Sequence, residues 1–101
     1  MAVTSQLSED GKTLTISISG RFDIATFKEF GEAYKGKLGS FSKCVVDMAQ
    51  VEHLDSSALG QLLMLRERSG GESADIRIVK PNPKVKNILT MAKFDLLFKI
   101  E

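Results

Sequence analysis

Cysteine, histidine, proline and tryptophan are scarce in this sequence: its 101 residues include one Cys, one His, two Pro and no Trp. Because Cys44 stands alone, no internal disulfide can form, which is usual for proteins of a reducing compartment. The N-terminus lacks the positively charged start and apolar run of a signal peptide, and no apolar stretch is long enough to span a bilayer. We therefore expect a cytoplasmic protein without membrane insertion.

An excess of charge of one sign is also absent. Lysine and arginine number 14 and aspartate and glutamate 13, which gives a formal net charge of +1. Basic residues do gather between Lys80 and Lys93, but at the spacing of a solvated helix face. This balance gives no reason to expect a nucleic-acid partner. The length and the hydrophobic fraction of 43% fit a single globular domain over residues 1–101.

The motifs that mark enzymes and metal proteins are missing. The sequence contains no HExxH, CxxC, Walker loop, GxGxxG or GxSxG. His53, which we expect in a loop, has no visible catalytic partner, and no base is visible that could activate Ser56. We therefore expect no catalytic site, no cofactor and no metal, and a structural or solvent-exposed role for His53.

What the sequence does contain is an alternation of strand-like and helix-like segments. Strands are predicted at 3–8, 13–19 (ended by Gly20), 43–48, 76–79 and 96–100. An Asp-Gly turn signal joins the first two strands into a hairpin. Helices are predicted from about Phe27, over 56–69, and from Pro83 with Asn82 as N-cap. This order predicts an α/β fold with a mixed, mainly parallel sheet, an N-terminal hairpin and helices packed against the sheet.

The start of the first helix carries two further signals. Thr26 and Glu29 have the spacing of a capping box. An apolar face, which we interpret as core packing, is formed by Phe27, Phe30, Tyr34 and Leu38.

The segment that starts the second helix is the most unusual part of the chain. At 100° per residue, the predicted core face consists of Ala58, Leu59, Leu62, Leu63 and Leu65. The opposite face is small and nearly uncharged, and it consists of Ser57, Gly60, Gln61 and Met64. Glycine here costs the helix roughly 1 kcal/mol against alanine, so this face suits close approach by another protein. Asp55 and Ser56 are also common capping residues, and on residue types alone a cap is the commoner role.

Three motifs make the chain resemble a STAS domain, the family of anti-sigma factor antagonists. Gly20-Arg21-Phe22-Asp23 is similar to the family pattern G-x-[LF]-D, and Val45-Val46-Asp47-Met48 is similar to its central strand. Leu54-Asp55-Ser56-Ser57-Ala58-Leu59-Gly60 resembles the phosphorylation motif D-S-[ST]-G-L-G. The resemblance runs from about Val3 to Ile100 and implies a STAS-like fold.

The resemblance implies that Ser56 is phosphorylated, with Asp55 positioning the site and Ser57 as a flanking hydroxyl. Together with the helix projection, it predicts a partner-binding surface consisting of Asp23, Asp55, Ser57, Ala58, Gly60, Gln61 and Met64. Two features depart from the pattern. Ala58 replaces a frequent glycine, and many antagonists carry a further C-terminal helix beyond the position of Glu101.

The implied partners are a serine kinase or anti-sigma factor of the histidine-kinase-like ATPase fold and a metal-dependent serine phosphatase. The resemblance thus implies a bacterial phosphoprotein that acts by partner switching in signal transduction and transcription regulation. Gly20 to Asp23 and the aromatic spacing of the first helix are similar to a gamma-proteobacterial subgroup that controls biofilm formation and motility.

Alternative functions remain open at this point. The first is a STAS accessory subunit of a membrane transporter complex, held by an ATPase without a phosphorylation cycle. The second is a sensor that binds a small ligand or nucleotide, for which the sequence contains no motif. The oligomeric state is also open, and strands this short are compatible with a monomer.

Overall fold

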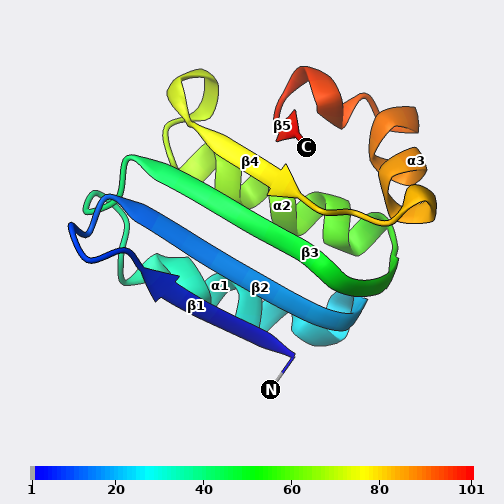
Figure 1. Cartoon of the computed structure of the whole chain (residues 1–101), viewed down its shortest axis with the longest axis horizontal. Coiled ribbons are helices and arrows are strands. Elements are labelled where there is room, and N and C mark those ends of the chain that lie inside the picture. The colour runs from blue at the N-terminus through cyan, green and yellow to red at the C-terminus, as the bar shows by residue number, and fades with distance from the viewer. Residues whose placement is uncertain (1) are drawn as a thin grey trace.

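The computed structural model describes residues 2–101 of the chain (Figure 1). The sheet consists of β1 (Val3–Leu7), β2 (Thr13–Phe22), β3 (Lys43–Leu54), β4 (Ile76–Val79) and β5 (Lys99–Ile100). The α-helices are α1 (Phe27–Lys35), α2 (Ser56–Arg68) and α3 (Pro83–Met91). Short 3-10 helices occupy Ile24–Thr26, Gly71–Ser73 and Phe94–Leu96. The strand order is β1-β2-β3-β4-β5, with β1 antiparallel to β2 and the other neighbours parallel. The predicted α/β fold is confirmed.

The alternating pattern of β2 decides which face of the sheet is buried. Leu14, Ile16 and Ile18 are almost fully buried, whereas Thr15 and Ser17 on the other face are only half-buried. Figure 1 shows α1 and α2 behind the sheet, so the core lies between these helices and the apolar side of the strands. Each such buried aliphatic side chain stabilises the fold by about 1.5–3 kcal/mol.

Strands β2 and β3 are longer than the sequence predicted. The prediction that Gly20 ends β2 is wrong, because the strand continues to Phe22 and β3 continues to Leu54. Gly20 has a φ of 78° and lies at an irregularity in the β2–β3 pairing, where glycine lets a strand bend without ending. Phe22 pairs with Leu54, and both side chains are buried. The extensions therefore bring the two strand ends side by side.

The predicted capping box of α1 does not form. The hydroxyl of Thr26 donates to the backbone oxygen of Asp23 at 2.7 Å instead of capping the helix. A short 3-10 helix, Ile24–Thr26, precedes α1. The Asp23 side chain caps this 3-10 helix by accepting a hydrogen bond from the Ala25 amide.

The predicted apolar face of α1 is confirmed only in its centre. Phe30 and Tyr34 are 1% exposed, and their rings pack edge-on with centroids 5.8 Å apart. Phe27 is 43% exposed, and Leu38 lies beyond the end of the helix and is 36% exposed. The face is shorter than predicted because α1 is only nine residues long and ends at Lys35, before Leu38.

In the C-terminal part of the chain, the predicted start of α3 is confirmed, whereas the predicted last strand is too long. Asn82 is the N-cap of α3, since its side chain accepts from the Val85 amide at 2.8 Å, and Pro83 occupies the first helical position. The predicted strand over 96–100 shortens to β5, because a 3-10 turn first stacks the rings of Phe94 and Phe98 at 5.4 Å.

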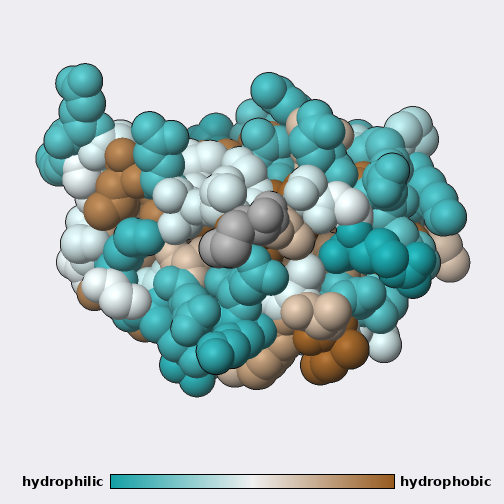
Figure 2. Space-filling model, turned by 90° about the horizontal axis from the view of Figure 1, so that it is seen from below, coloured by the Kyte–Doolittle hydropathy of each residue, from teal (hydrophilic) through white to brown (hydrophobic). Residues whose placement is uncertain are grey.

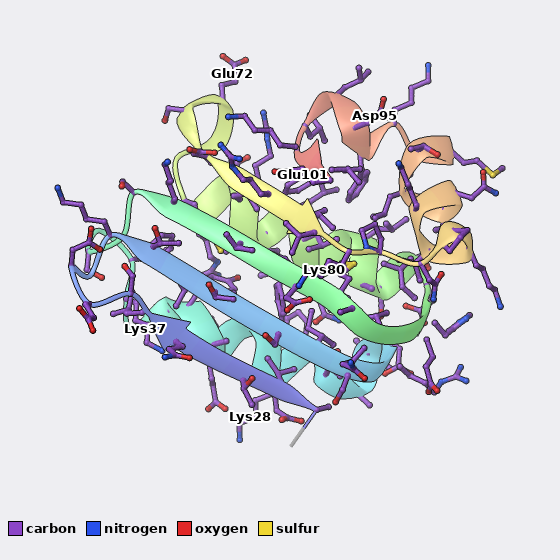
Figure 3. The ribbon with its side chains drawn as sticks, viewed as in Figure 1. Lys28, Lys37, Glu72, Lys80, Asp95 and Glu101 are labelled. Carbon is purple, nitrogen blue, oxygen red and sulfur yellow. The ribbon has the colours of Figure 1, made fainter. Side chains whose placement is uncertain are left out.

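One edge of the sheet is formed by β1. The surface seen from this side is mostly hydrophilic, with separate hydrophobic patches (Figure 2). Thr4 and Gln6 are exposed on β1, and Lys37, labelled in Figure 3, donates to Ser5 at 2.8 Å. Polar and charged side chains of this kind protect an edge strand from pairing with another chain.

Candidate functional site

The candidate site lies where β2 and β3 end next to each other. Phe22 and Leu54 are register partners, so the residues that follow them, Asp23 and Asp55, leave the sheet at the same edge. Each aspartate has extended backbone angles and accepts hydrogen bonds from amides of the helical segment that it precedes. The sequence thus forms the same strand–aspartate–helix junction twice, side by side.

Asp55 is the N-cap of α2. Its Oδ1 accepts from the amides of Ser57 and Ala58 at 3.0 and 3.2 Å, and from the hydroxyl of Ser57 at 2.9 Å. The Ser57 hydroxyl is the main cause that lowers the pKa of Asp55, with smaller contributions from the two amides and from His53. The carboxylate is therefore ionised at neutral pH, and the capping role that residue types suggested belongs to Asp55.

Ser56 is the first residue of α2, and its side chain is exposed. Within residues 2–101, no side-chain hydrogen bond involves its hydroxyl, whereas the Ser57 hydroxyl is held by Asp55. The two adjacent serines therefore differ. Ser57 belongs to the cap, and Ser56 offers an accessible hydroxyl at a helix N-terminus, where the helix dipole favours an anion.

The outer face of α2 differs from the prediction in two positions. Gln61 was expected on this face but is only 3% exposed, and Leu63 was expected in the core but is 42% exposed. The reason is that α1 packs along one flank of α2 and covers Gln61, which rotates the buried sector toward α1. The outer face near Ser56 therefore consists of Gly60, Leu63 and the half-buried Met64.

Ala58, also assigned to the partner-binding surface, has no exposed side chain. Its Cβ belongs to the core, and Gln61 is buried as well, so neither side chain is part of the exposed surface of α2. Their assignment to a partner-binding surface stays a prediction. Gly60 is exposed, and a Cβ placed on it would meet nothing within 4 Å. Nothing inside the described protein explains why this helical position is glycine.

Gln61 connects the two junctions. Its Nε2 donates to the backbone oxygen of Asp23 at 2.8 Å, which joins α2 to the turn after β2. The turn then presents Ile24, 69% exposed, and the first turn of α1 presents Phe27. Phe27 lines one small hollow together with Met64 of α2, and the exposed Ile24 is a residue that sequence analysis missed. The sequence does have an apolar residue, Ile24, directly after the aspartate that follows β2. Because Ile24 belongs to no helical repeat of apolar residues, the repeats could not reveal it.

Two further residues complete the surroundings of the site. Asn82 donates from Nδ2 to the backbone oxygen of Val51 at 3.1 Å, which fastens the start of α3 to the end of β3. His53 lies in β3 opposite Arg21 and is half-buried, so its expected position in a loop is wrong. Among residues 2–101, no three His, Cys, Asp or Glu side chains are grouped to hold a metal ion.

Across the same residues, no helix has the length and apolar character that crossing a membrane requires.

Comparison with known proteins places this geometry in context. A family model described as "Mlab, STAS domain" matches residues 5–99. A STAS-domain containing protein from Pseudomonas aeruginosa (strain UCBPP-PA14) is 45% identical over 100 residues, covering 99% of both chains.

Two solved structures have the same fold. The anti-sigma factor antagonist SpoIIAA of Bacillus, in its unphosphorylated form, superposes with a TM-score of 0.77 at 14% identity, covering 99% of this chain and 87% of that chain. The STAS domain of a SulP transporter from Vibrio cholerae superposes with a TM-score of 0.67 at 14% identity, covering 94% of this chain and 77% of that chain. One fold thus occurs in proteins of different roles.

Proposed function

This chain belongs to the STAS domain family, and we propose that it is a non-catalytic protein-binding switch of the anti-sigma factor antagonist type, controlled by phosphorylation of Ser56. One observation carries the proposal: Ser56 has the only free hydroxyl of the Asp55–Ser57 cap, at an exposed helix N-terminus beside an uncharged surface. The likeness of the fold to SpoIIAA, which has been solved in unphosphorylated and phosphorylated forms, supports it.

Phosphorylation of Ser56 would change the surface more than the fold. The phosphate adds about −1.5 to −2 charges at pH 7. The N-terminus of α2 favours this charge by about 0.3–1 kcal/mol, and the neighbouring ionised Asp55 opposes it by like-charge repulsion. Because these terms are similar in size and opposite in sign, the domain keeps its structure. The partner therefore responds to the added charge and not to a change in the fold.

The same charge would decide partner binding. In the unphosphorylated state, the partner packs on Gly60 and Met64 without having to desolvate an anion. In the phosphorylated state, burying a dianion costs several kcal/mol unless the partner supplies a cation. Since about 1.4 kcal/mol is a factor of ten in affinity, this cost releases the partner.

The partners that fit this scheme are a serine kinase of the histidine-kinase-like ATPase fold, which also acts as the anti-sigma factor, and a serine phosphatase. The kinase transfers the γ-phosphoryl group of ATP to the Ser56 oxygen, the hydroxyl proton leaves with a base of the kinase, and ADP is released. This cycle places the switch in the cytoplasm, where ATP is available.

The test is peptide mass spectrometry on the protein isolated from its native cells, comparing wild type with Ser56→Ala. We expect an added mass of about 80 Da, one phosphoryl group, on the peptide that contains Ser56 in the wild type only. If no growth condition yields the modification and Ser56→Ala functions normally, the proposal fails. The transporter-subunit function, with a transport ATPase as stable partner, would then replace it.

A further inference from the structure

Positive charge gathers in residues 76–98, the part of the chain that contains β4 and α3. This segment has five lysines and arginines and a single acid, Asp95. Arg77 is paired with two acids, Asp75 and Glu101. The other four cations are exposed and take part in no ion pair within residues 2–101: Lys80, Lys84, Lys86 and Lys93. Their charge therefore has no counterpart in the described part of the chain.

Two of these lysines occupy positions where lysine costs stability. Lys84 is the second residue of α3, whose first turn contains no acid, and the helix dipole disfavours a cation at that end. Lys93 follows the C-cap of α3 with a φ of 61°, in the left-handed region that glycine or asparagine usually fills. Residues that work against their local structure in this way are expected at functional sites.

Apolar side chains are exposed beside these two lysines. Met91 is 76% and Leu96 is 75% exposed, the highest values among the large apolar side chains of residues 2–101. Lys84 and Met91 are seven residues apart, so they lie on one flank of α3, and Asn87 between them donates to the Met91 sulfur at 3.5 Å. The Leu96 amide donates to the Lys93 backbone oxygen at 3.2 Å, within the 3-10 helix that packs against α3.

These residues form a mixed surface that we call the α3 surface, and it consists of Lys84, Asn87, Met91, Lys93 and Leu96. Figure 1 shows α3 at one end of the sheet, whereas α1 and α2 lie behind the sheet. None of the five residues belongs to the outer face of α2 near Ser56. The α3 surface is therefore a feature that the phosphorylation switch does not use.

The composition of the α3 surface limits what can cover it. A nucleic acid would engage the lysines but would leave Met91 and Leu96 exposed to water. A flat bilayer fits poorly, because Lys84 and Lys86 are about 200° apart around α3 and cannot both face one plane. A protein segment can follow a single flank of the helix. Carboxylates on such a segment would match the unpaired cations, and an apolar side chain would cover the exposed ones.

We propose that the α3 surface binds an acidic segment of a partner protein. Asp or Glu side chains of the segment face Lys84 and Lys93, and an apolar side chain between them packs on Met91 and Leu96. The inference goes beyond the proposed function and does not depend on phosphorylation of Ser56. The charges speed the encounter and select the partner, and the apolar contact in the centre holds it.

Lys84 allows a test that leaves the fold intact. In Lys84→Glu the helix dipole favours the new side chain, so the melting temperature should stay the same or rise. Lys28→Glu is the matched control, because Lys28 is the exposed second residue of α1 and lies at the opposite edge of the molecule from α3 (Figure 3). Both variants change the net charge equally. Lys93→Gly removes the second cation and suits the left-handed backbone, so it should also keep or raise the melting temperature.

The first step of the experiment captures the partner segment in native cells. A benzophenone amino acid replaces Met91, the cells are irradiated, and the cross-linked peptide is identified by mass spectrometry. We expect a protein segment with Asp or Glu next to an apolar residue. A synthetic peptide of that segment is then titrated against the variants. Binding should be about tenfold weaker for Lys84→Glu, at least about threefold weaker for Lys93→Gly, and within about twofold of wild type for Lys28→Glu.

A charge reversal in the peptide completes the test. The peptide in which the acid facing Lys84 is replaced by lysine should bind Lys84→Glu better than it binds wild type. Equal affinity of wild type and Lys84→Glu for the original peptide, or a captured segment without acids, would overturn the inference. So would a cross-link to lipid together with Lys84-dependent binding to phosphatidylglycerol vesicles, which would assign the surface to a membrane. None of these results bears on the phosphorylation of Ser56, so the proposed function stands or falls separately.

Discussion

Gln61 and Asp23, 38 residues apart in the chain, are joined by a hydrogen bond of 2.8 Å from the Gln61 side-chain amide to the Asp23 backbone oxygen. The bond ties α2 to the turn between β2 and α1. The same oxygen accepts from the hydroxyl and amide of Thr26, at 2.7 and 3.1 Å. Asp23 therefore remains hydrogen-bonded when Gln61 is replaced.

Gln61→Met is expected to keep or raise folding stability. The variant loses one hydrogen bond, worth about 1 kcal/mol, but it also removes a buried acceptor whose missing partner costs about 1–3 kcal/mol. Since the second term equals or exceeds the first, the free energy of unfolding should stay the same or rise by up to about 2 kcal/mol. Urea unfolding with an unchanged m-value measures it. A loss of more than about 1 kcal/mol would contradict this balance and would show that the hydrogen bond from Gln61 to Asp23 is a structural tie.

Ser56→Ala and Ser56→Asp should fold equally well and bind differently. Ser56 makes no side-chain hydrogen bond within residues 2–101, so Ser56→Ala should unfold within about 0.5 kcal/mol of wild type. The aspartate is favoured by the helix dipole and opposed by Asp55, which also leaves a net effect below about 1 kcal/mol. Calorimetry of the kinase complex should give tight binding for Ser56→Ala and at least about tenfold weaker binding for Ser56→Asp. Equal affinities would rule out the charge mechanism.

Asp55 should make stability depend on pH at the acid end. Its pKa is lowered below the ordinary 3.8, mainly by the Ser57 hydroxyl, so the folded state stays ionised where the unfolded chain has taken up a proton. The stabilisation is therefore complete above that ordinary value and is lost as pH falls through the folded pKa. Asp55→Asn, which can still cap α2, should flatten this part of the melting temperature profile.

Asp10 is the control for this measurement, because a hydrogen bond from the Ser8 hydroxyl lowers its pKa as well. Asp10→Asn should remove a separate part of the acid dependence and leave the part due to Asp55. If Asp55→Asn and wild type have superimposable profiles from about pH 6 to about pH 2, the capped carboxylate does not contribute.

Gly60→Ala should separate stability from binding. The position is inside α2 and exposed, and a Cβ there meets no atom within 4 Å, so alanine should stabilise the protein by about 0.5–1 kcal/mol. If a partner packs closely against this face, the added methyl group should weaken its binding. Thermal unfolding and kinase titration of one variant check both effects. Stabilisation with unchanged affinity would show that Gly60 lies outside the interface.

Cys44 should be unreactive in the folded protein. Its side chain is 1% exposed, and burial raises the pKa of the thiol to about 12. The thiolate is the reactive form, so a disulfide reagent at neutral pH should label Cys44 only when the protein unfolds. The raised pKa also means that stability falls once pH exceeds the ordinary thiol value of 9.0, where only the unfolded chain ionises. Rapid labelling under native conditions would contradict this.

The sequence by itself was sufficient for several elements that local patterns control. Alternation in 13–19 predicted β2, Asn82-Pro83 predicted the start of α3, and Asp55-Ser56 marked the junction at which α2 begins. Period, capping chemistry and turn residues act over a few neighbours, so they can be recognised without knowing what packs where. The order of these segments was then enough for the fold.

The tertiary structure alone decided which sides of those segments face a neighbour. Gln61 is buried and Leu63 is exposed because α1 packs on one flank of α2, and the helical projection of a single helix contains no information about that packing. Likewise, Asp23 lies beside Asp55 only because Phe22 pairs with Leu54. Burial and long-range hydrogen bonds depend on residues distant in the chain, and these determine which groups of the predicted site a partner can reach.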